Sequence, residues 1–252
     1  KLEYLRNDAA HTRVHDVTTA EASLTLRYAP GESFVNSKQR RIPVSLDAPI
    51  FTLTHAMGFK GVLGGEYSFN RTEASVWKRF WLPSSWGKID CSIKAGAEWN
   101  TVPFPLLILP EANLSYITQR ETFNLINNME FLNDRFASVS LSYDMNGKLF
   151  NRIPLIKNLK WREMFRVRAL WGTLTDKNNP FKSSNPDLFR FPMRDGKFTS
   201  FVMDPKIPYV EASVGIYNIF KLLHIEYVHR FTYRDNPGIN KNGVRFMVLM
   251  AF

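Results

Sequence analysis

The amino-acid sequence predicts an all-β fold, and three observations support this prediction. Apolar and polar side chains alternate with a period of two over many segments, as in strands whose two faces meet different surroundings. No run approaches the roughly 18 to 20 apolar residues of a membrane-spanning helix. In the last segment, 243–252, the residues Val244, Phe246, Val248, Met250 and Phe252 place one unbroken apolar stripe on one face, and the segment ends on Phe252. Together these observations predict an antiparallel transmembrane β-barrel, with about ten strands in this chain.

The alternation is strongest in four segments, and none of them fits the helical period of 3.6. From Ile89 to Asn100, apolar side chains such as Ile93 oppose polar ones such as Lys94 at every step. The other three strong segments are Ala20–Tyr28, Ala137–Met145 and Phe165–Trp171. Weaker alternation predicts further strands at Lys1–Asn7, Phe51–Phe59, Phe69–Leu82, Tyr209–Phe220, Leu223–Tyr233 and in the closing segment.

The closing segment also predicts a compartment. Its apolar side chains, from Val244 to Phe252, fall on one face, as a lipid-facing strand requires. A terminal strand that ends on Phe resembles the signal by which an assembly machinery inserts barrels into the bacterial outer membrane. The residues of this predicted signal are Phe246, Val248, Met250 and Phe252.

Composition narrows the choice of partners. The chain has 33 Lys and Arg against 23 Asp and Glu, a formal net charge of +10. The basic residues form no single stripe and accompany no recognition-helix or RNA-binding signature, so nucleic acid is not an expected partner. Outer-membrane lipid with its anionic lipopolysaccharide suits a basic barrel better. The single cysteine, Cys91, excludes an internal disulfide and the common cysteine zinc spacings.

The polar faces of the predicted strands carry charges of both signs. The simplest interpretation is a hydrated, ion-paired barrel interior, and the functional one is a selective passage or a surface on which a plug docks. The predicted inward-facing charged residues are Glu21, Arg27, Asp90, Lys94, Glu98, Arg166, Arg168, Glu226, Arg230 and Arg234.

Signals for catalysis and metal binding are weak. His11 and His15 have a spacing that would align two ligands on a helix, but they lie in a predicted loop without further ligands. The inward serines Ser138, Ser140 and Ser142 would need His224 or Glu226 beside them as a base, and nothing in the sequence brings these groups together. We therefore predict a protein without catalytic residues, metal or cofactor.

Two histidines and one loop segment interrupt the pattern. His55 and His229 fall on the apolar faces of their strands, which predicts either a local β-bulge or a contact with a partner protein. Val102–Pro110 is an apolar, proline-broken run inside the long loop Thr101–Asn133, which is expected on the outer side of the membrane. Such a run either folds into the barrel as a plug or covers a neighbouring protein.

A soluble β-sandwich also alternates, because its apolar face packs against a second sheet. The many charges on the other face, the long strands and the terminal Phe252 favour the membrane barrel over the sandwich.

Three long stretches carry a resemblance to a known family. They read SLDAPIFTLTHAMGFKGVLGGEYSFNRTEASVWKRFWL, WNTVPFPLLILPEANLSYITQRETFNLINNMEFLNDRFASVSLSYDMNGKLFNRIPL and PYVEASVGIYNIFKLLHIEYVHRFTY. They resemble the barrel region of a Bacteroidetes outer-membrane family of unknown function. In that family a carboxypeptidase-regulatory-like domain precedes a carboxy-terminal barrel. The resemblance implies that residues 1–252 are one barrel domain at the end of a longer protein.

More distantly, the strand order is similar to the surface-antigen superfamily of BamA-like barrels, which implies that these strands are the carboxy-terminal part of a sixteen-stranded barrel. The superfamily's Arg-Gly-aromatic loop motif is absent from Thr101–Asn133, so the resemblance implies architecture and not insertase activity. The expected function is a non-enzymatic accessory or anchor in outer-membrane protein assembly or export, working in a protein complex. The alternatives are a channel or receptor for solutes and, third, a soluble β-domain that binds an anionic ligand.

Overall fold

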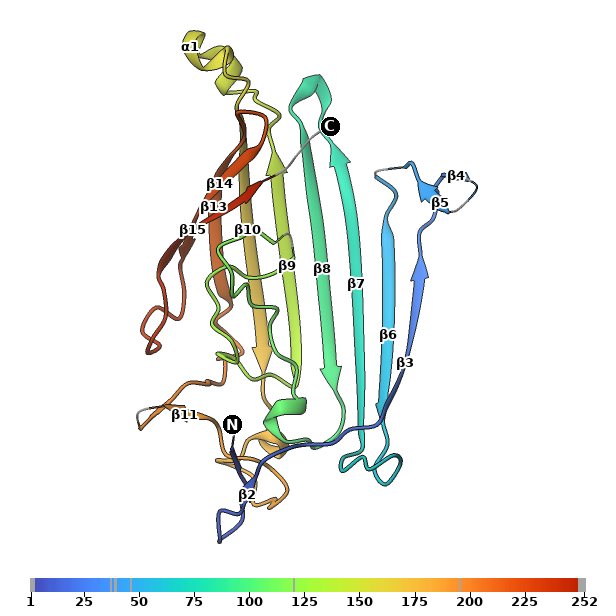
Figure 1. Cartoon of the computed structure of the whole chain (residues 1–252), viewed down its shortest axis with the longest axis vertical. Helices are drawn as coiled ribbons and strands as arrows, with labels where there is room; N and C mark the ends of the chain where they lie inside the picture. Colours follow the sequence, from blue (N-terminus) through green and yellow to red (C-terminus); the bar gives the residue numbers. More distant parts are fainter. Residues whose placement is uncertain are drawn as a thin grey trace.

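The fold is dominated by one large antiparallel sheet (Figure 1). A computed structural model describes residues 3–36, 38, 40–45, 47–119, 121–194 and 196–248. Nine strands pair in the order β15-β14-β13-β10-β9-β8-β7-β6-β3, so neighbours in the sheet are successive long strands of the chain. These strands are β3 (Glu21–Tyr28), β6 (Ile50–Gly58), β7 (Phe69–Trp81), β8 (Lys88–Glu98), β9 (Arg135–Asp144), β10 (Arg162–Thr173), β13 (Tyr209–Ile219), β14 (Leu223–Arg230) and β15 (Asn242–Val248).

The remaining elements are short. Three small hairpins pair β1 (Tyr4–Leu5) with β2 (Arg13–Val14), β4 (Phe34–Asn36) with β5 (Arg41–Pro43), and β11 (Met193–Arg194) with β12 (Lys197–Phe198). One helical turn, α1 (Pro154–Lys157), lies between β9 and β10. Single 3-10 turns occupy Pro83–Ser85, Phe104–Leu106, Phe150–Arg152 and Asp176–Asn178.

The prediction of an all-β chain with a large antiparallel sheet is confirmed. Nine of the predicted strands are present, with ends that differ by a few residues. Lys1–Asn7 was wrongly assigned to the sheet, because Tyr4–Leu5 pairs locally with β2. The sheet is also open in the described part of the chain, since β3 and β15 form its two edges and do not pair with each other. The closed barrel is therefore not observed there.

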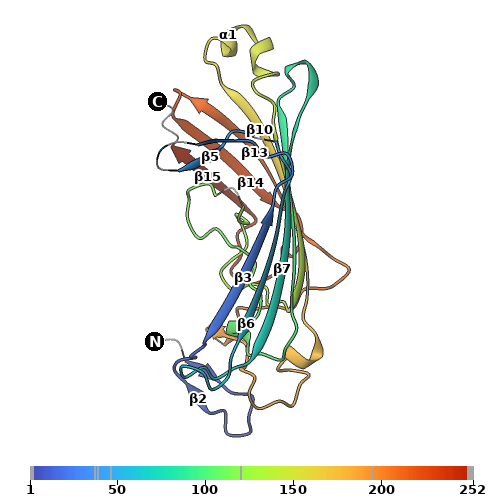
Figure 2. The ribbon, with the colours of Figure 1, turned by 90° about the vertical axis from the view of Figure 1, so that its right-hand side faces the viewer.

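The two faces of the sheet differ sharply in chemistry. The register places Leu24, His55, Thr72 and Ala97 in one row across four strands, and the apolar residues of the other strands continue the same face. Seen from the side, the sheet curves, and the loop between β8 and β9 lies on its concave side (Figure 2). Lys94, which alternates with the apolar residues of β8, pairs with carboxylates of this loop, so the apolar face is the convex one. The large apolar side chains exposed on it include Leu24, Leu26, Phe51, Leu53, Val76, Ile93, Leu141, Val167, Val214, Tyr227, Val244 and Phe246.

The concave side carries the core. Two long loops, 99–134 and 174–208, fold against it and bury apolar side chains between themselves and the sheet. One cluster joins Phe69 to Phe104 and Phe189, and a second joins Phe131 to Leu170 and Tyr209. Because the core lies on this side alone, the convex side has no apolar partner within the described residues.

Candidate functional site

The concave face gathers most of the charged residues that were predicted to face inward. The register places the following nine on it: Glu21, Arg27, Asp90, Lys94, Glu98, Arg166, Arg168, Glu226 and Arg230. Glu21 and Arg27 are exposed on the edge strand β3, apart from the others. The prediction that Arg234 faces inward is wrong, because β14 ends at Arg230 and the chain turns at Tyr233, whose φ is +53°. Arg234 is exposed in the following loop.

The loop between β8 and β9, predicted to lie outside the barrel, folds back along this face (Figures 1 and 2). Its apolar run Val102–Pro110 begins in the core, where Val102 is fully buried and Phe104 packs edge-on against Phe189. Of the two uses predicted for this run, the structure therefore shows packing within the chain. Burial of these side chains is the main force that holds the start of the loop, at about 25 cal/mol per Å² of apolar surface.

Buried charges hold the middle of the loop. The carboxylate of Glu211 on β13 accepts backbone N–H groups of Asn124 at 2.9 Å and Leu125 at 3.1 Å. It also accepts the Tyr209 hydroxyl at 2.9 Å and pairs with Arg168 at 3.1 Å. A buried carboxylate with several donors is well compensated, whereas an isolated one would be strongly disfavoured. Glu211 thus fixes the loop backbone to the sheet.

Arg230 provides the second anchor. Its guanidinium pairs with Glu130 of the loop at 2.6 and 3.1 Å, and both side chains are almost completely buried. It also donates to the carbonyl groups of Leu125 at 3.2 Å and Tyr233 at 2.8 Å. Burial raises the pKa of the Tyr233 phenol, which donates to the carbonyl of Ile207 at 2.6 Å and so ties in the second long loop.

Glu130, Tyr209 and Asn124 were missed by the sequence analysis. Glu130 stands between apolar neighbours in a loop, where neither period two nor period 3.6 assigns it a face. The one available signal was an excess of arginine on the inward faces of β10 and β14, which requires acidic partners elsewhere in the chain.

A further buried pair joins Arg166 on β10 to Glu226 on β14 at 2.8 Å. His224 lies 3.4 Å from the same carboxylate, and Ser213 donates to it. Glu226 is therefore occupied as an ion-pair partner. The serines of β9 lie three strand spacings from β14, roughly 14 Å away, so the sheet separates the groups of the hypothetical Ser-His pairing.

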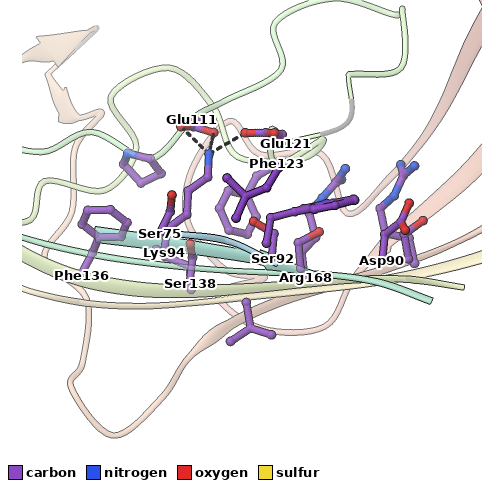
Figure 3. A pocket seen from close by; sticks show the side chains of 18 of the residues that line it. Ser75, Asp90, Ser92, Lys94, Glu111, Glu121, Phe123, Phe136, Ser138 and Arg168 are labelled. Carbon is purple, nitrogen blue, oxygen red and sulfur yellow. Dashed lines mark hydrogen bonds and ion pairs between the residues drawn. The ribbon is translucent and has the colours of Figure 1, made fainter. Parts of the chain in front are cut away.

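Between the sheet and the loop lies a cavity of about 900 Å³, within the usual size range of small-molecule sites (Figure 3). Lys94 rises from its floor and pairs with two loop carboxylates, Glu111 at 3.0 Å and Glu121 at 2.8 Å. The strand serines Ser92 and Ser138 line the floor beside it. The Lys94 ion pairs therefore join the sheet to the loop at the cavity.

The two histidines on the convex face lie in regular strands. The register runs without interruption through His55 and His229, so the β-bulge predicted at these positions is wrong. Each imidazole instead has a polar neighbour on the same face. Nδ1 of His55 lies 2.9 Å from the Thr72 hydroxyl, and Nδ1 of His229 lies 2.5 Å from Oδ1 of Asn242. These hydrogen bonds lower the free-energy cost of placing the two imidazoles on an apolar face.

Only part of the predicted assembly signal can be placed. Phe246 and Val248 lie on β15 with side chains on the convex face, whereas Met250 and Phe252 are outside the described residues. At its outer edge β15 pairs with the loop. The N–H of Phe246 donates to the carbonyl of Tyr116 at 2.9 Å, and the N–H of Thr118 donates to the carbonyl of Phe246 at 2.9 Å. The loop thus crosses the concave face and reaches the far edge of the sheet.

The described residues contain no group of three or more His, Cys, Asp or Glu side chains placed to hold a metal ion. In the same part of the chain no helix has the length and apolar character needed to cross a membrane.

Comparison with known proteins identifies the family. No curated protein matches the chain. The family model that describes the C-terminal domain of DUF5686, a family of unknown function, matches residues 4–181 of the sequence. The match covers more than half of the chain. The strands β13, β14 and β15 lie beyond the matched segment, yet they complete the same sheet and supply Glu211 and Arg230. This protein belongs to the DUF5686 family, of which it carries the C-terminal domain.

Proposed function

We propose that this chain forms part of a transmembrane β-barrel in the bacterial outer membrane. The observation that carries the proposal is the apolar convex face, which is continuous across nine paired strands and has no partner among the described residues. Water would not favour an apolar surface of that extent, and lipid would. The longer strands β7, β8 and β10 have 13, 11 and 12 residues, enough for the roughly 9 to 11 residues of a tilted membrane strand.

Within that membrane we propose a non-enzymatic role as an anchor or accessory in outer-membrane protein assembly or export, with protein partners. The loop held by Glu211 and Arg230 supports this role, because an interior filled by the chain itself suits an anchor better than an open pore. Lipid and lipopolysaccharide are the expected surroundings of the convex face. Its polar groups near one end, such as His55 with Thr72 and His229 with Asn242, suit the depth of the headgroups.

The membrane proposal is tested with two lysine substitutions at neighbouring positions of β8. Ile93 is exposed on the convex face, and Ser92 lines the concave cavity. A Lys at lipid depth costs about 2 to 4 kcal/mol, so Ile93→Lys lowers insertion into liposomes while the control Ser92→Lys inserts like the wild type. Flotation after an alkaline wash measures insertion. Equal insertion of both variants, or a folded protein that stays soluble without detergent, contradicts the proposal.

The anchor role is tested by crosslinking in intact cells and purification of the full protein. We expect proteins of outer-membrane assembly or export to copurify, and planar bilayers to show no steady conductance. The second candidate is a channel or receptor for solutes, which the cavity of about 900 Å³ favours. Steady conductance without copurifying assembly proteins would support that candidate and refute the anchor role.

A further inference from the structure

The basic side chains that line the cavity are already paired within the protein. Its five basic side chains each face a carboxylate, and these pairs are Arg79 with Asp90 at 2.6 Å, Lys88 with Asp144 at 3.7 Å, Lys94 with Glu121 at 2.8 Å, Arg166 with Glu226 at 2.8 Å and Arg168 with Glu211 at 3.1 Å. An anionic ligand would have to compete with a carboxylate at every one of these positions. Of the five lining carboxylates, Asp90, Asp144, Glu111 and Glu121 are engaged in ion pairs, and Glu73 has no partner among the described residues. The ionic lining therefore disfavours an anionic ligand, and it offers a cationic one a single unengaged carboxylate.

Small hydroxyl side chains form the floor of the cavity. In the register, Ser92 on β8 stands directly opposite Ser140 on β9, and Ser75 and Ser138 flank Lys94 on either side. Figure 3 shows Ser75, Ser92 and Ser138 on the sheet below the loop that carries Glu111 and Glu121. Within the described residues, these four serines make no side-chain hydrogen bond. Each hydroxyl is therefore available to a ligand as both donor and acceptor.

One buried amide at the cavity is also without a partner. Asn133 lines the cavity with 1% of its surface exposed, and neither Oδ1 nor Nδ2 has a hydrogen-bond partner among the described residues. Gly172 makes the space for this side chain, because a Cβ there would come within 2.2 Å of Oδ1. A buried amide left unpaired costs about 1 to 3 kcal/mol, so an external partner at this position would be favourable.

The cavity lining also includes the indole ring of Trp77, which stands next to Ser92, its partner in the register between β7 and β8. The guanidinium of Arg79 lies over this ring, 5.4 Å from its centroid, so a ligand would pack on the opposite face of the indole. An indole ring beside hydroxyl groups suits a ligand whose rings are apolar on their faces and polar at their edges. Sugar rings have this character, with C–H groups on the face and hydroxyl groups around the edge.

We propose that the cavity binds a neutral oligosaccharide, which packs a ring on Trp77 and exchanges hydrogen bonds with the serine floor and with the amide of Asn133. This inference goes beyond the anchor role and does not depend on the membrane proposal, because it concerns the opposite face of the sheet. The paired basic side chains contribute to this selectivity, because each of them already holds a carboxylate and an anionic ligand would have to displace it.

The proposal is tested by calorimetric titration of the full chain in a detergent without a sugar headgroup, so that the detergent does not compete. The probes are maltotetraose, cellotetraose and chitotetraose, and tetragalacturonate serves as an anionic counterpart. We expect saturable binding of at least one neutral probe with a Kd below about 1 mM, and binding of tetragalacturonate that is at least about tenfold weaker.

Two variants and a matched control locate the binding. Trp77→Ala removes the aromatic surface and Ser140→Val removes a floor hydroxyl, and each is expected to weaken binding at least about tenfold. Phe80→Ala truncates an exposed aromatic side chain on the same strand as Trp77 but on the convex face, and should bind like the wild type. Circular dichroism establishes that each variant is folded. Absence of saturable binding for all three neutral probes up to about 10 mM, tighter binding of the anionic probe, or an equal loss in Phe80→Ala overturns the proposal.

Discussion

Replacement of Arg230 by Met should detach the loop from the sheet. The guanidinium has five N–H groups, and all five are used: two bond to Glu130, and the others donate to the carbonyls of Leu125, Thr232 and Tyr233. Met keeps much of the volume and removes every donor. The carboxylate of Glu130, 1% exposed, then remains buried without a cation.

The expected loss of stability follows from these contacts. Removing one partner of a buried ion pair costs about 3 to 5 kcal/mol. Glu130 retains two donors, the backbone N–H of Asn127 at 3.0 Å and the side-chain amide of Asn236 at 2.9 Å, so the loss should lie near the lower end, about 3 kcal/mol. The double variant Arg230→Met with Glu130→Met also removes the carboxylate that has lost its cation. It should recover about half or more of the lost stability.

Urea unfolding in detergent micelles measures the effect. With a slope of about 3 kcal/mol per M, a loss of about 3 kcal/mol lowers the midpoint by about 1 M. Chymotrypsin, which cleaves after aromatic residues and Leu, should also cut the loop 99–134 faster. Arg234→Met is the matched control, because this exposed arginine should change stability by less than about 0.5 kcal/mol. An Arg230→Met midpoint equal to that of the control, or a double variant as unstable as the single one, would refute the role of this pair.

Three further outcomes are expected. Gly172→Ala should lower stability by about 1 to 3 kcal/mol in thermal unfolding, since the added Cβ falls 2.2 Å from Oδ1 of Asn133; an unchanged midpoint would mean that the amide has room to move. Lys94→Met should change stability by less than about 1 kcal/mol, because its two carboxylate partners are 52% and 64% exposed, but should speed chymotrypsin cleavage of the loop; unchanged cleavage would show that the lysine does not hold the loop. Phe252→Asp should lower membrane insertion without changing the properties of the inserted molecules, and normal insertion in cells would exclude an assembly signal at this terminus.

Much of the sheet could be predicted from the sequence because its determinants are local. Alternation at Ile89–Asn100 shows which residues share a face, and the structure keeps Asp90, Lys94 and Glu98 together on the concave side. The same reasoning failed at Tyr4–Leu5, where a few alternating residues did not distinguish a sheet strand from a small hairpin. Short alternating segments carry little information about which partner they choose.

The arrangement of the site could not be predicted, because its contacts join distant parts of the chain. Glu130 and Arg230 are 100 residues apart, and no periodicity relates a loop carboxylate to an arginine on a strand. The unpartnered amide of Asn133 likewise depends on Gly172 across the fold. The apolar run Val102–Pro110 is visible in the sequence together with its two possible uses, but the choice between them depends on which residues are buried, and only the folded chain defines this.

The positions of the loop anchors also constrain the order in which the chain folds. The loop that begins after β8 is synthesised well before the strands that hold it, and its contacts span 87 residues to Glu211, 100 to Arg230 and 121 to Arg245. Closure of such long chain segments is slow, since their entropy is lost before the contacts form. The hairpins from β6 to β9 should therefore assemble first, and docking of the loop should be a late step that waits for β13 to β15. Until then the apolar and acidic side chains of the loop stay accessible. A folding chaperone that covers exposed apolar surface is therefore expected to bind the chain in this interval.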